Sequence, residues 1–186
     1  IIGGALSHPV TTLRRIGPVD GTALTADGPA PGAPLGWRPM PLVDLDEIET
    51  VTAQALVRHG ARDDVAGSVA RAVRVAEANG NRICGLYYLE SYCRQLETGR
   101  VDGTAEPVVT VERPGAVRVN GRLGFAQPAF AAGLATAVGS ARANGICGYA
   151  IEHTHTCTSL GYFTEQFARL DLLAVGATNA TARVAP

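Results

Sequence analysis

Apolar residues recur every three or four positions in two successive stretches of the chain, which is the spacing of one helix face. The first stretch begins at Asp44, an N-cap residue with Glu47 as its capping-box partner, and closes at Gly60. The second begins at Asp63 and stops at Asn79-Gly80, a typical helix end. The pattern predicts two amphipathic helices joined by a short turn.

The hydrophobic period changes further along the chain. Residues Leu86–Leu96 have the spacing of a third helix. Apolar and polar residues then alternate in Val108–Val111 and in Val117–Val119, on either side of Pro114-Gly115. Two alternating runs with a turn between them are typical of a β-hairpin, so strands are expected to begin here.

The last part of the chain mixes helices and strands. Ala129–Ala143 is predicted to be an alanine-rich helix. Two apolar runs, Ile146–Glu152 and Leu172–Thr178, are predicted to be buried strands that flank a helix near Gly161–Leu170. Helices followed by such a sequence of elements predict a mixed α/β fold.

Three segments follow from this order of elements. Residues 1–41 are a Gly/Pro-rich arm without a periodic pattern, and their strongest turn signal lies at residues 28–34. Residues 42–104 are predicted to form a helical subdomain, and residues 105–186 to begin an α/β domain. The arm is expected either to be a poorly ordered tail or to wrap another surface or a partner chain.

Composition favours a small-molecule or protein partner over nucleic acid or a membrane. The 186 residues, 46% of them hydrophobic, suffice for a core of one or two domains. The formal net charge is −1, without a block of like charges, so no nucleic acid or membrane partner is predicted. The four cysteines include no Cys-x-x-Cys pair, which indicates free thiols in a reducing compartment. With no signal-peptide pattern or membrane-length apolar run in the sequence, a cytoplasmic location is expected.

Cys84 is one candidate for chemistry. It follows the second predicted helix and a short loop, with Arg82 two residues before it. A nearby cation increases the thiolate fraction of a cysteine, and the thiolate is the nucleophilic form. A free cysteine also packs well as a small buried residue, so both interpretations stay open.

His153, His155 and Cys157 are spaced two apart after a predicted strand. If the extended backbone continues, their side chains share one face. Such a face suits a histidine general base beside a thiol or another reacting group. A metal site is not predicted, because no Cys-x-x-Cys or His-Glu-x-x-His pattern supports one. Substrate binding and structural hydrogen bonding are the remaining alternatives.

Three motifs occur in order along the chain: Gly80–Gly85 with Tyr92 behind it, His153–Tyr162, and Thr178-Asn179-Ala180 ahead of Val184-Ala185-Pro186. Together they resemble the signatures of the type-2 malate/L-lactate dehydrogenase family. That family contains NAD(P)H-dependent enzymes of 2-hydroxy acids and cyclic imino acids, and its cofactor fold is not a Rossmann fold. The resemblance covers residues 42–186 and implies a helical subdomain followed by the first part of a mixed α/β cofactor domain.

The chain departs from the family pattern at three positions. Cys84 stands in place of the proton-transfer histidine, Thr156 in place of a second histidine, and Tyr88 in place of a carboxylate-binding arginine. Loss of that arginine argues for a substrate without the usual 2-oxo-acid group. The predicted catalytic residues are the reactive side chains that remain near these positions: Cys84, His153 and His155.

The same resemblance implies contacts to substrate and cofactor. The substrate site is implied to be lined by residues of the first two motifs: Tyr88, Tyr92, Thr156 and Cys157. Tyr88 and Tyr92 are one turn apart and so share a helix face, where plain packing is the alternative. NAD or NADP is implied to contact the third motif at Thr178 and Asn179.

These residues imply a diverged bacterial NAD(P)H-dependent oxidoreductase that acts, as an oligomer, on a small oxo, hydroxy or imino substrate. The alternative is a repurposed fold, cleaved into two chains, that performs acyl transfer or hydrolysis through Cys84 or a nucleophile exposed by cleavage. A third hypothesis is a cofactor-free binding subunit. A second polypeptide that completes the sheet beyond Pro186 is expected, because an exposed sheet edge invites aggregation.

Overall fold

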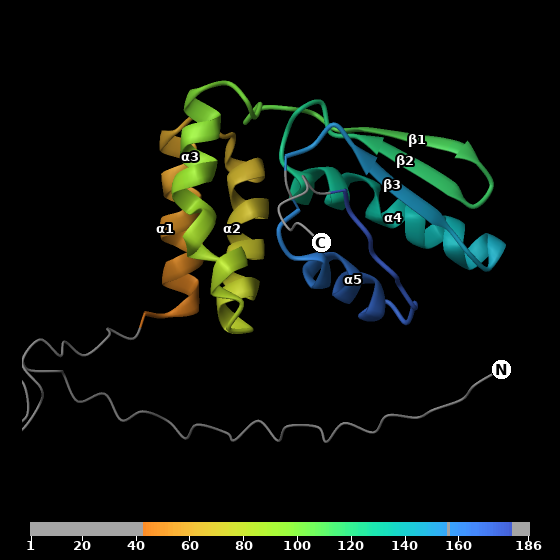
Figure 1. Ribbon diagram of the computed structural model, residues 1–186. Coiled ribbons are helices and arrows are strands. Elements are labelled where there is room, and N and C mark those ends of the chain that lie inside the picture. The colour runs from red at the N-terminus through yellow and green to blue at the C-terminus, as the bar shows by residue number, and fades with distance from the viewer. Residues whose placement is uncertain (1–42, 156, 180–186) are drawn as a thin grey trace, which may run out of the picture. The chain divides into compact units, whose positions relative to one another are not determined.

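A computed structural model describes residues 43–155 and 157–179 of the chain (Figure 1). The predictions for the arm at residues 1–41, for Thr156 and for residues 180–186 lie outside the described residues. The described residues belong to one compact unit. Its helices and three-stranded sheet confirm the predicted mixed α/β class, whereas a division at residue 104 stays a prediction.

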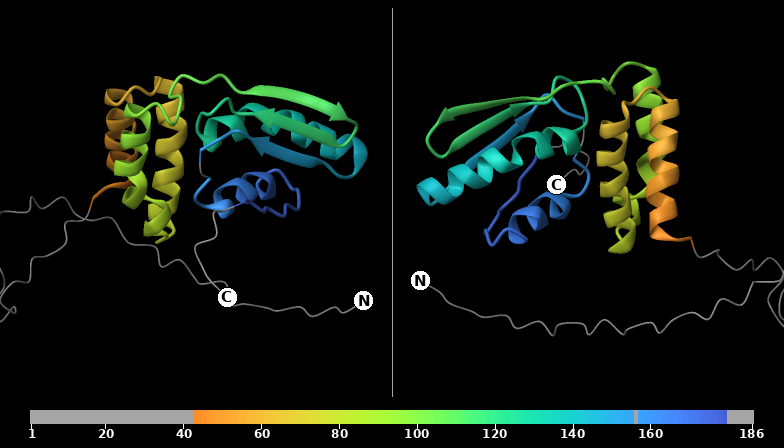
Figure 2. Two further views of the ribbon diagram at one scale, coloured as in Figure 1. Left: turned by 45° about the horizontal axis from the view of Figure 1, so that its top comes forward. Right: turned by 180° about the vertical axis from the view of Figure 1, so that it is seen from behind.

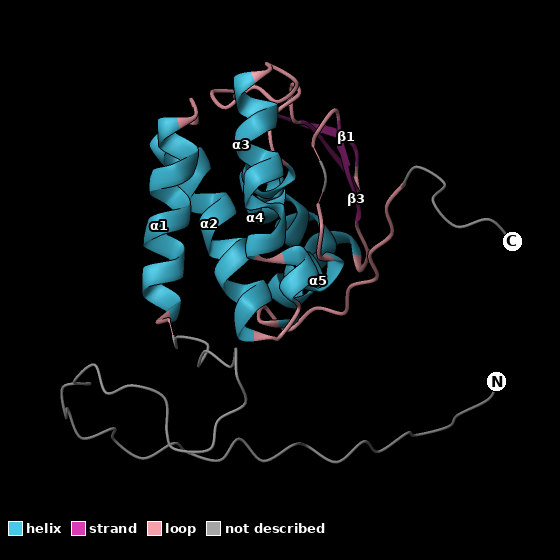
Figure 3. Ribbon diagram, turned by 60° about the vertical axis from the view of Figure 1, so that its left-hand side comes forward, coloured by secondary structure: helices cyan, strands magenta, loops and turns pink. Residues whose placement is uncertain are grey.

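Helices α1 (Leu45–Arg58) and α2 (Asp63–Ala78) confirm the first two predicted helices. Helix α3 (Leu89–Glu97) starts later than predicted. The residues before it form two short 3-10 turns, η1 (Arg82–Cys84) and η2 (Leu86–Tyr88), because the extended backbone of the intervening glycine prevents one continuous helix. Figures 1 and 3 show the three α-helices side by side. Buried apolar residues of all three helices belong to one core cluster.

The start of α1 differs in detail from the expected capping box. Asp44 is the N-cap, and its carboxylate accepts a hydrogen bond from the Asp46 N–H at 2.7 Å. The described residues show no reciprocal bond from Glu47 to this cap. The Asp44 carboxylate still accepts a hydrogen bond from an otherwise unpaired N–H, and its negative charge interacts favourably with the positive end of the helix dipole.

The sheet has the order β1-β2-β3. Strands β1 (Val108–Arg113) and β2 (Ala116–Asn120) form the predicted antiparallel hairpin, and β3 (Gly148–Glu152) pairs with β2 in parallel. The first two residues of the third predicted strand, at 146–147, lie outside β3. Helix α4 (Ala126–Asn144) makes the crossover between the parallel strands and covers one face of the sheet (Figure 2).

Helix α4 packs against the sheet through β2 and β3 and also contacts α2 of the helical part. Gly133 allows the approach, because a Cβ atom there would lie 2.5 Å from both the Tyr149 hydroxyl and a Val119 methyl. The Tyr149 hydroxyl donates to the Phe130 carbonyl at 2.6 Å. Helix α5 (Leu160–Ala168) confirms the last predicted helix, and Phe163 packs on Phe130 with ring centroids 4.9 Å apart.

The prediction of a buried strand at Leu172–Thr178 is wrong for the described residues. This segment is irregular and exposed, with Leu173 at 97% and Val175 at 94% exposure. It returns along α5, where Gly176 faces the side chain of Thr164. A strand needs hydrogen bonds from a neighbouring strand, and none of the described strands pairs with it. Among the residues that the structure describes, no helix is long and apolar enough to cross a membrane.

Gly103 is expected to be intolerant of a side chain. A Cβ atom there would lie 2.6 Å from the Gly60 carbonyl oxygen and 2.8 Å from the Ala61 Cα, while the Gly103 carbonyl accepts a bond from the Arg62 N–H at 2.9 Å. Gly103→Ala should lower the free energy of unfolding by about 2 kcal/mol through overpacking. Urea unfolding followed by circular dichroism measures this change.

Gly67 in α2 provides the matched control. Apart from its chain neighbours and the backbone of its own helix, no atom lies within 4 Å of a Cβ built at Gly67, and the position is helical. Gly67→Ala should raise the free energy of unfolding by about 0.5–1 kcal/mol through helix propensity. Equal urea midpoints for the Gly103 and Gly67 variants would contradict the packing described for Gly103.

Candidate functional site

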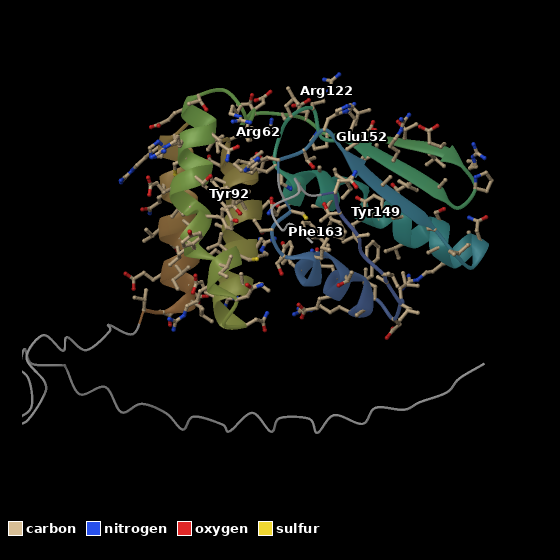
Figure 4. All side chains as sticks on the ribbon, viewed as in Figure 1. Arg62, Tyr92, Arg122, Tyr149, Glu152 and Phe163 are labelled. Carbon is tan, nitrogen blue, oxygen red and sulfur yellow. The ribbon has the colours of Figure 1, made fainter. Side chains whose placement is uncertain are left out.

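A cluster of rings surrounds Tyr92 where α3, the start of α4 and the segment after β3 meet. Tyr92 is labelled on the ribbon in Figure 4. Tyr92 is 1% exposed. Its ring stacks on Tyr88 with centroids 6.1 Å apart and meets Phe125 edge-on at 5.6 Å. The His155 ring lies edge-on to Tyr92 at 6.0 Å and an interplanar angle of 90°. We call Tyr88, Tyr92, Phe125 and His155 the ring cluster.

Backbone hydrogen bonds fix His155 against the loop that precedes α4. The His155 N–H donates to the Gly124 carbonyl at 2.8 Å, and the Leu123 N–H donates to the His153 carbonyl at 2.7 Å. Phe125 and His155 also form an isolated parallel β-bridge. The main chain therefore sets the position of the imidazole, instead of leaving it to a flexible loop.

Both loops of the site contain unusual backbone conformations. Four of the five non-glycine residues with positive φ in the described parts lie on them: Arg122 (51°), Leu123 (65°), His153 (52°) and Thr158 (52°). Such conformations cost on the order of 1 kcal/mol or more each and cluster at functional sites. The surrounding hydrogen bonds and packing must therefore hold these loops in place.

The Tyr92 hydroxyl lies among several predicted site residues. Burial raises its pKa to about 12, and hydrogen bonding with the Thr158 side chain offsets part of that effect. The side chains of Cys84, Tyr88 and Cys157 are close enough to raise the same pKa further. The structure thus brings residues of the first two motifs together at one hydroxyl, which stays protonated at neutral pH.

His155 is half-buried, and its environment favours the neutral imidazole. Burial lowers the pKa of His155 from its ordinary value, and the positive charge of Arg100 lowers it further. A neutral imidazole has one nitrogen that donates and one that accepts. When protonated, this histidine is a stronger acid than an ordinary one, so it is suited to proton transfer.

His153 does not share a face with His155 and Cys157, contrary to the prediction. Its left-handed backbone, with φ 52°, ends the extended run after β3. The exposed His153 ring lies 3.8 Å from a carboxylate oxygen of Glu152, which in turn lies 3.6 Å from Arg118. Within the parts of the chain that the structure describes, no three His, Cys, Asp or Glu residues are grouped as a metal site.

The other predicted site residues are Cys84 and Cys157, which lie near the Tyr92 hydroxyl, and Thr178 and Asn179, which lie in the segment after α5. Cys84 and Cys157 are partly buried, and Cys157 packs against the apolar cluster around Phe130. Thr178 and Asn179 are exposed and irregular, so the prediction that they close a buried strand is wrong. Their cofactor role stays a prediction.

Some residues of the site were not predicted from the sequence. Phe125 follows Gly124 at the head of α4, and an aromatic residue directly after a glycine turn was a usable signal. Gln127 is 3% exposed, and its side-chain oxygen has no hydrogen-bond partner in the described structure. Gln127 could have been predicted, because it is a polar residue within the apolar first turn of α4. Thr158 lies inside the second motif but was not singled out there, and Arg100 was not predicted because tertiary contacts bring it to the site.

The lowered pKa of His155 predicts a pH dependence of stability. The unfolded chain has the ordinary, higher pKa and takes up the proton first as pH falls. Stability from His155 is therefore present above about pH 6.5 and declines as pH falls toward its folded pKa. Urea unfolding of wild type and His155→Gln across this range measures it, and the wild type should lose stability more steeply. Parallel curves would contradict burial of the neutral ring.

Comparison with known proteins relates this chain to a family of enzymes. The sequence model of the malate/L-lactate dehydrogenase family matches residues 43–186. A Δ1-pyrroline-2-carboxylate/Δ1-piperideine-2-carboxylate reductase of Pseudomonas putida is 34% identical over 144 residues, which are 77% of this chain and 42% of that protein. A (2R)-3-sulfolactate dehydrogenase (NADP(+)) of Chromohalobacter salexigens is 36% identical over 146 residues, 78% of this chain and 43% of that protein.

Solved structures show the same relationship. The crystal structure of Δ1-piperideine-2-carboxylate reductase from Pseudomonas syringae pv. tomato has a TM-score of 0.68 and 31% sequence identity, over 70% of this chain and 40% of that chain. Sulfolactate dehydrogenase from Methanocaldococcus jannaschii, at 19% identity and a TM-score of 0.64 over 68% of this chain and 37% of that one, shares the fold. The chain spans less than half the length of the relatives it matches.

Proposed function

The chain belongs to the malate/L-lactate dehydrogenase family. We propose that it provides the proton donor of an NAD(P)H-dependent reductase that acts on small cyclic imino acids or 2-oxo acids. The observation that carries this proposal is the half-buried His155 held against Tyr92 by the backbone at the end of β3. Cyclic imino acids are the preferred class, because relatives at 34% and 32% identity are named for pyrroline and piperideine carboxylates.

Reduction of a C=N or C=O group requires a hydride at carbon and a proton at nitrogen or oxygen. NAD(P)H supplies the hydride when bound. His155 gives the proton to the nitrogen or oxygen, and its lowered pKa makes the imidazolium a ready donor. Tyr92 positions the imidazole through the ring contact, while Cys84 contributes a small polar group beside the Tyr92 hydroxyl.

Several described residues fit part of a dinucleotide. Helix α4 begins without a side-chain cap, and the positive end of a helix dipole suits a phosphate oxygen. The unpartnered oxygen of Gln127 requires a donor, which a ribose hydroxyl or the nicotinamide carboxamide offers. These groups, with Thr178 and Asn179, are the proposed cofactor contacts on this chain.

The test uses the full-length protein with NADPH and with NADH. Loss of reduced-cofactor absorbance is followed after addition of Δ1-piperideine-2-carboxylate, Δ1-pyrroline-2-carboxylate or pyruvate. We expect turnover with at least one cyclic imino acid and a weaker rate with pyruvate. No oxidation of either cofactor with any of these compounds would refute the proposal.

A further inference from the structure

The proposed substrates carry a carboxylate, so the site needs a positive charge near His155. The sequence has 16 arginines and no lysine, so a permanent positive side-chain charge near His155 has to come from a guanidinium group. Tyr88, whose ring stacks on Tyr92, offers a hydroxyl and no charge. The inference below rests on the proposed function, because it assigns the group that recognises the substrate of that site.

Arg100 follows α3 in a segment that the backbone ties to the site. The next residue, Val101, is 2% exposed and belongs to the same core cluster as Tyr92 and Phe125. Its N–H donates to the Gln95 carbonyl at 3.2 Å. The segment is thereby anchored between the end of α3 and the ring cluster.

A second tie joins this segment to the loop before α4. The Asp102 N–H donates to the Leu123 carbonyl at 3.0 Å, and the next residue of that loop, Gly124, accepts the bond from His155. Three chain segments thus run next to one another, and they carry Arg100, the loop before α4, and His155. The guanidinium is near enough to His155 to lower the pKa of that imidazole.

The charge of Arg100 is available for a ligand. Arg100 is exposed and has no ion pair or side-chain hydrogen bond to the residues that the structure describes. By contrast, Arg62 binds Asp64 at 2.6 Å and Arg94 binds Glu90 at 2.9 Å. The nearest acid along the chain, Asp102, is occupied, because its Oδ1 accepts bonds from the N–H and the hydroxyl of Thr104, both at 2.8 Å.

We propose that Arg100 binds the substrate carboxylate beside His155 and thereby determines specificity for 2-carboxylates. A guanidinium fork can pair with both oxygens of a carboxylate, which fixes the orientation of the ring as well as its charge. The imino nitrogen, one carbon from that carboxylate, is then directed toward the imidazole. Recognition and proton transfer are supplied by two adjacent segments of this chain.

The test measures ligand binding by calorimetry on the full-length protein saturated with NADP⁺. The probes are pyrrole-2-carboxylate, a stable planar analogue of the imino acid, and pyrrole-2-carboxamide, its neutral counterpart. Arg100→Gln should weaken binding of the carboxylate about 10- to 100-fold, as expected for a lost charged hydrogen bond, and change the carboxamide less than about threefold. Arg100→Lys should restore part of the carboxylate affinity.

Arg113 is the matched control, because it is an exposed arginine at the end of β1 and has no ion pair among the described residues. Arg113→Gln should bind both compounds as the wild type does. Unchanged carboxylate binding by the Arg100→Gln variant would overturn the proposal, as would an equal loss for both compounds or no carboxylate binding by the wild type. Carboxylate binding through Arg100 without turnover of any imino acid would instead refute the proposed reaction alone.

Discussion

Replacing His155 with glutamine is expected to lower kcat for imino acid reduction by about 10²- to 10⁴-fold, the usual contribution of a positioned proton donor. Glutamine keeps the polarity and approximate size of the side chain but cannot carry the proton. The backbone bond from His155 to Gly124 does not depend on the side chain, so the site should keep its shape. Steady-state rates and circular dichroism on the full-length protein measure both quantities.

His153→Gln is the control variant for this experiment. The two histidines are two residues apart, yet the structure places His153 on the exposed side beside Glu152. Its replacement should change kcat by less than about threefold, as expected for a surface substitution away from the reacting groups. Equal losses in the two variants would mean that the loop as a whole, and not the His155 imidazole, supports turnover.

Replacing Tyr92 with alanine is expected to lower the free energy of unfolding by about 3–5 kcal/mol, the usual cost of deleting a buried ring. Tyr92 is 1% exposed and contacts the rings of Tyr88, Phe125 and His155, so its removal leaves a cavity between α3 and the start of α4. Urea unfolding at neutral pH measures the change. A loss below about 1 kcal/mol would mean that the ring cluster does not hold these elements together.

Two further variants separate the ring from its hydroxyl and from its neighbours. Tyr92→Phe keeps the ring contacts and should cost about 1–2 kcal/mol, because the hydrogen bonding with Thr158 is lost. Tyr87→Ala removes a ring of the same size that is 76% exposed, and should change stability by less than about 0.5 kcal/mol. The loss in the free energy of unfolding should therefore be largest for Tyr92→Ala, smaller for Tyr92→Phe and smallest for Tyr87→Ala.

Local signals were sufficient to predict most of the elements. Helices α1, α2 and α4 have long apolar periods with recognisable ends, and the β1-β2 hairpin has alternation around Pro114-Gly115. The segment Leu172–Thr178 has an equally apolar composition, yet it forms no strand among the described residues. Apolarity alone does not make a strand, because a strand also requires a hydrogen-bonding neighbour at a distant place in the sequence.

The candidate site was predictable in its members more than in its geometry. Cys84, Tyr88, Cys157 and His155 were identified from motifs, and the structure brings them to Tyr92. The left-handed backbone of His153 could not be predicted from the sequence, because histidine adopts both extended and left-handed conformations. Arg100 carried no signal of its own, since only the fold brings the end of α3 beside the segment after β3.

The most direct test of His155 as the proton donor is the pH dependence of kcat for reduction, measured on wild type and His155→Gln. Reduction requires the protonated imidazole, so the wild-type rate should fall as pH rises through the His155 pKa, which burial holds below its ordinary value of 6.5. The variant should lack this step while keeping a low residual rate. The same step in both proteins would show that another group donates the proton.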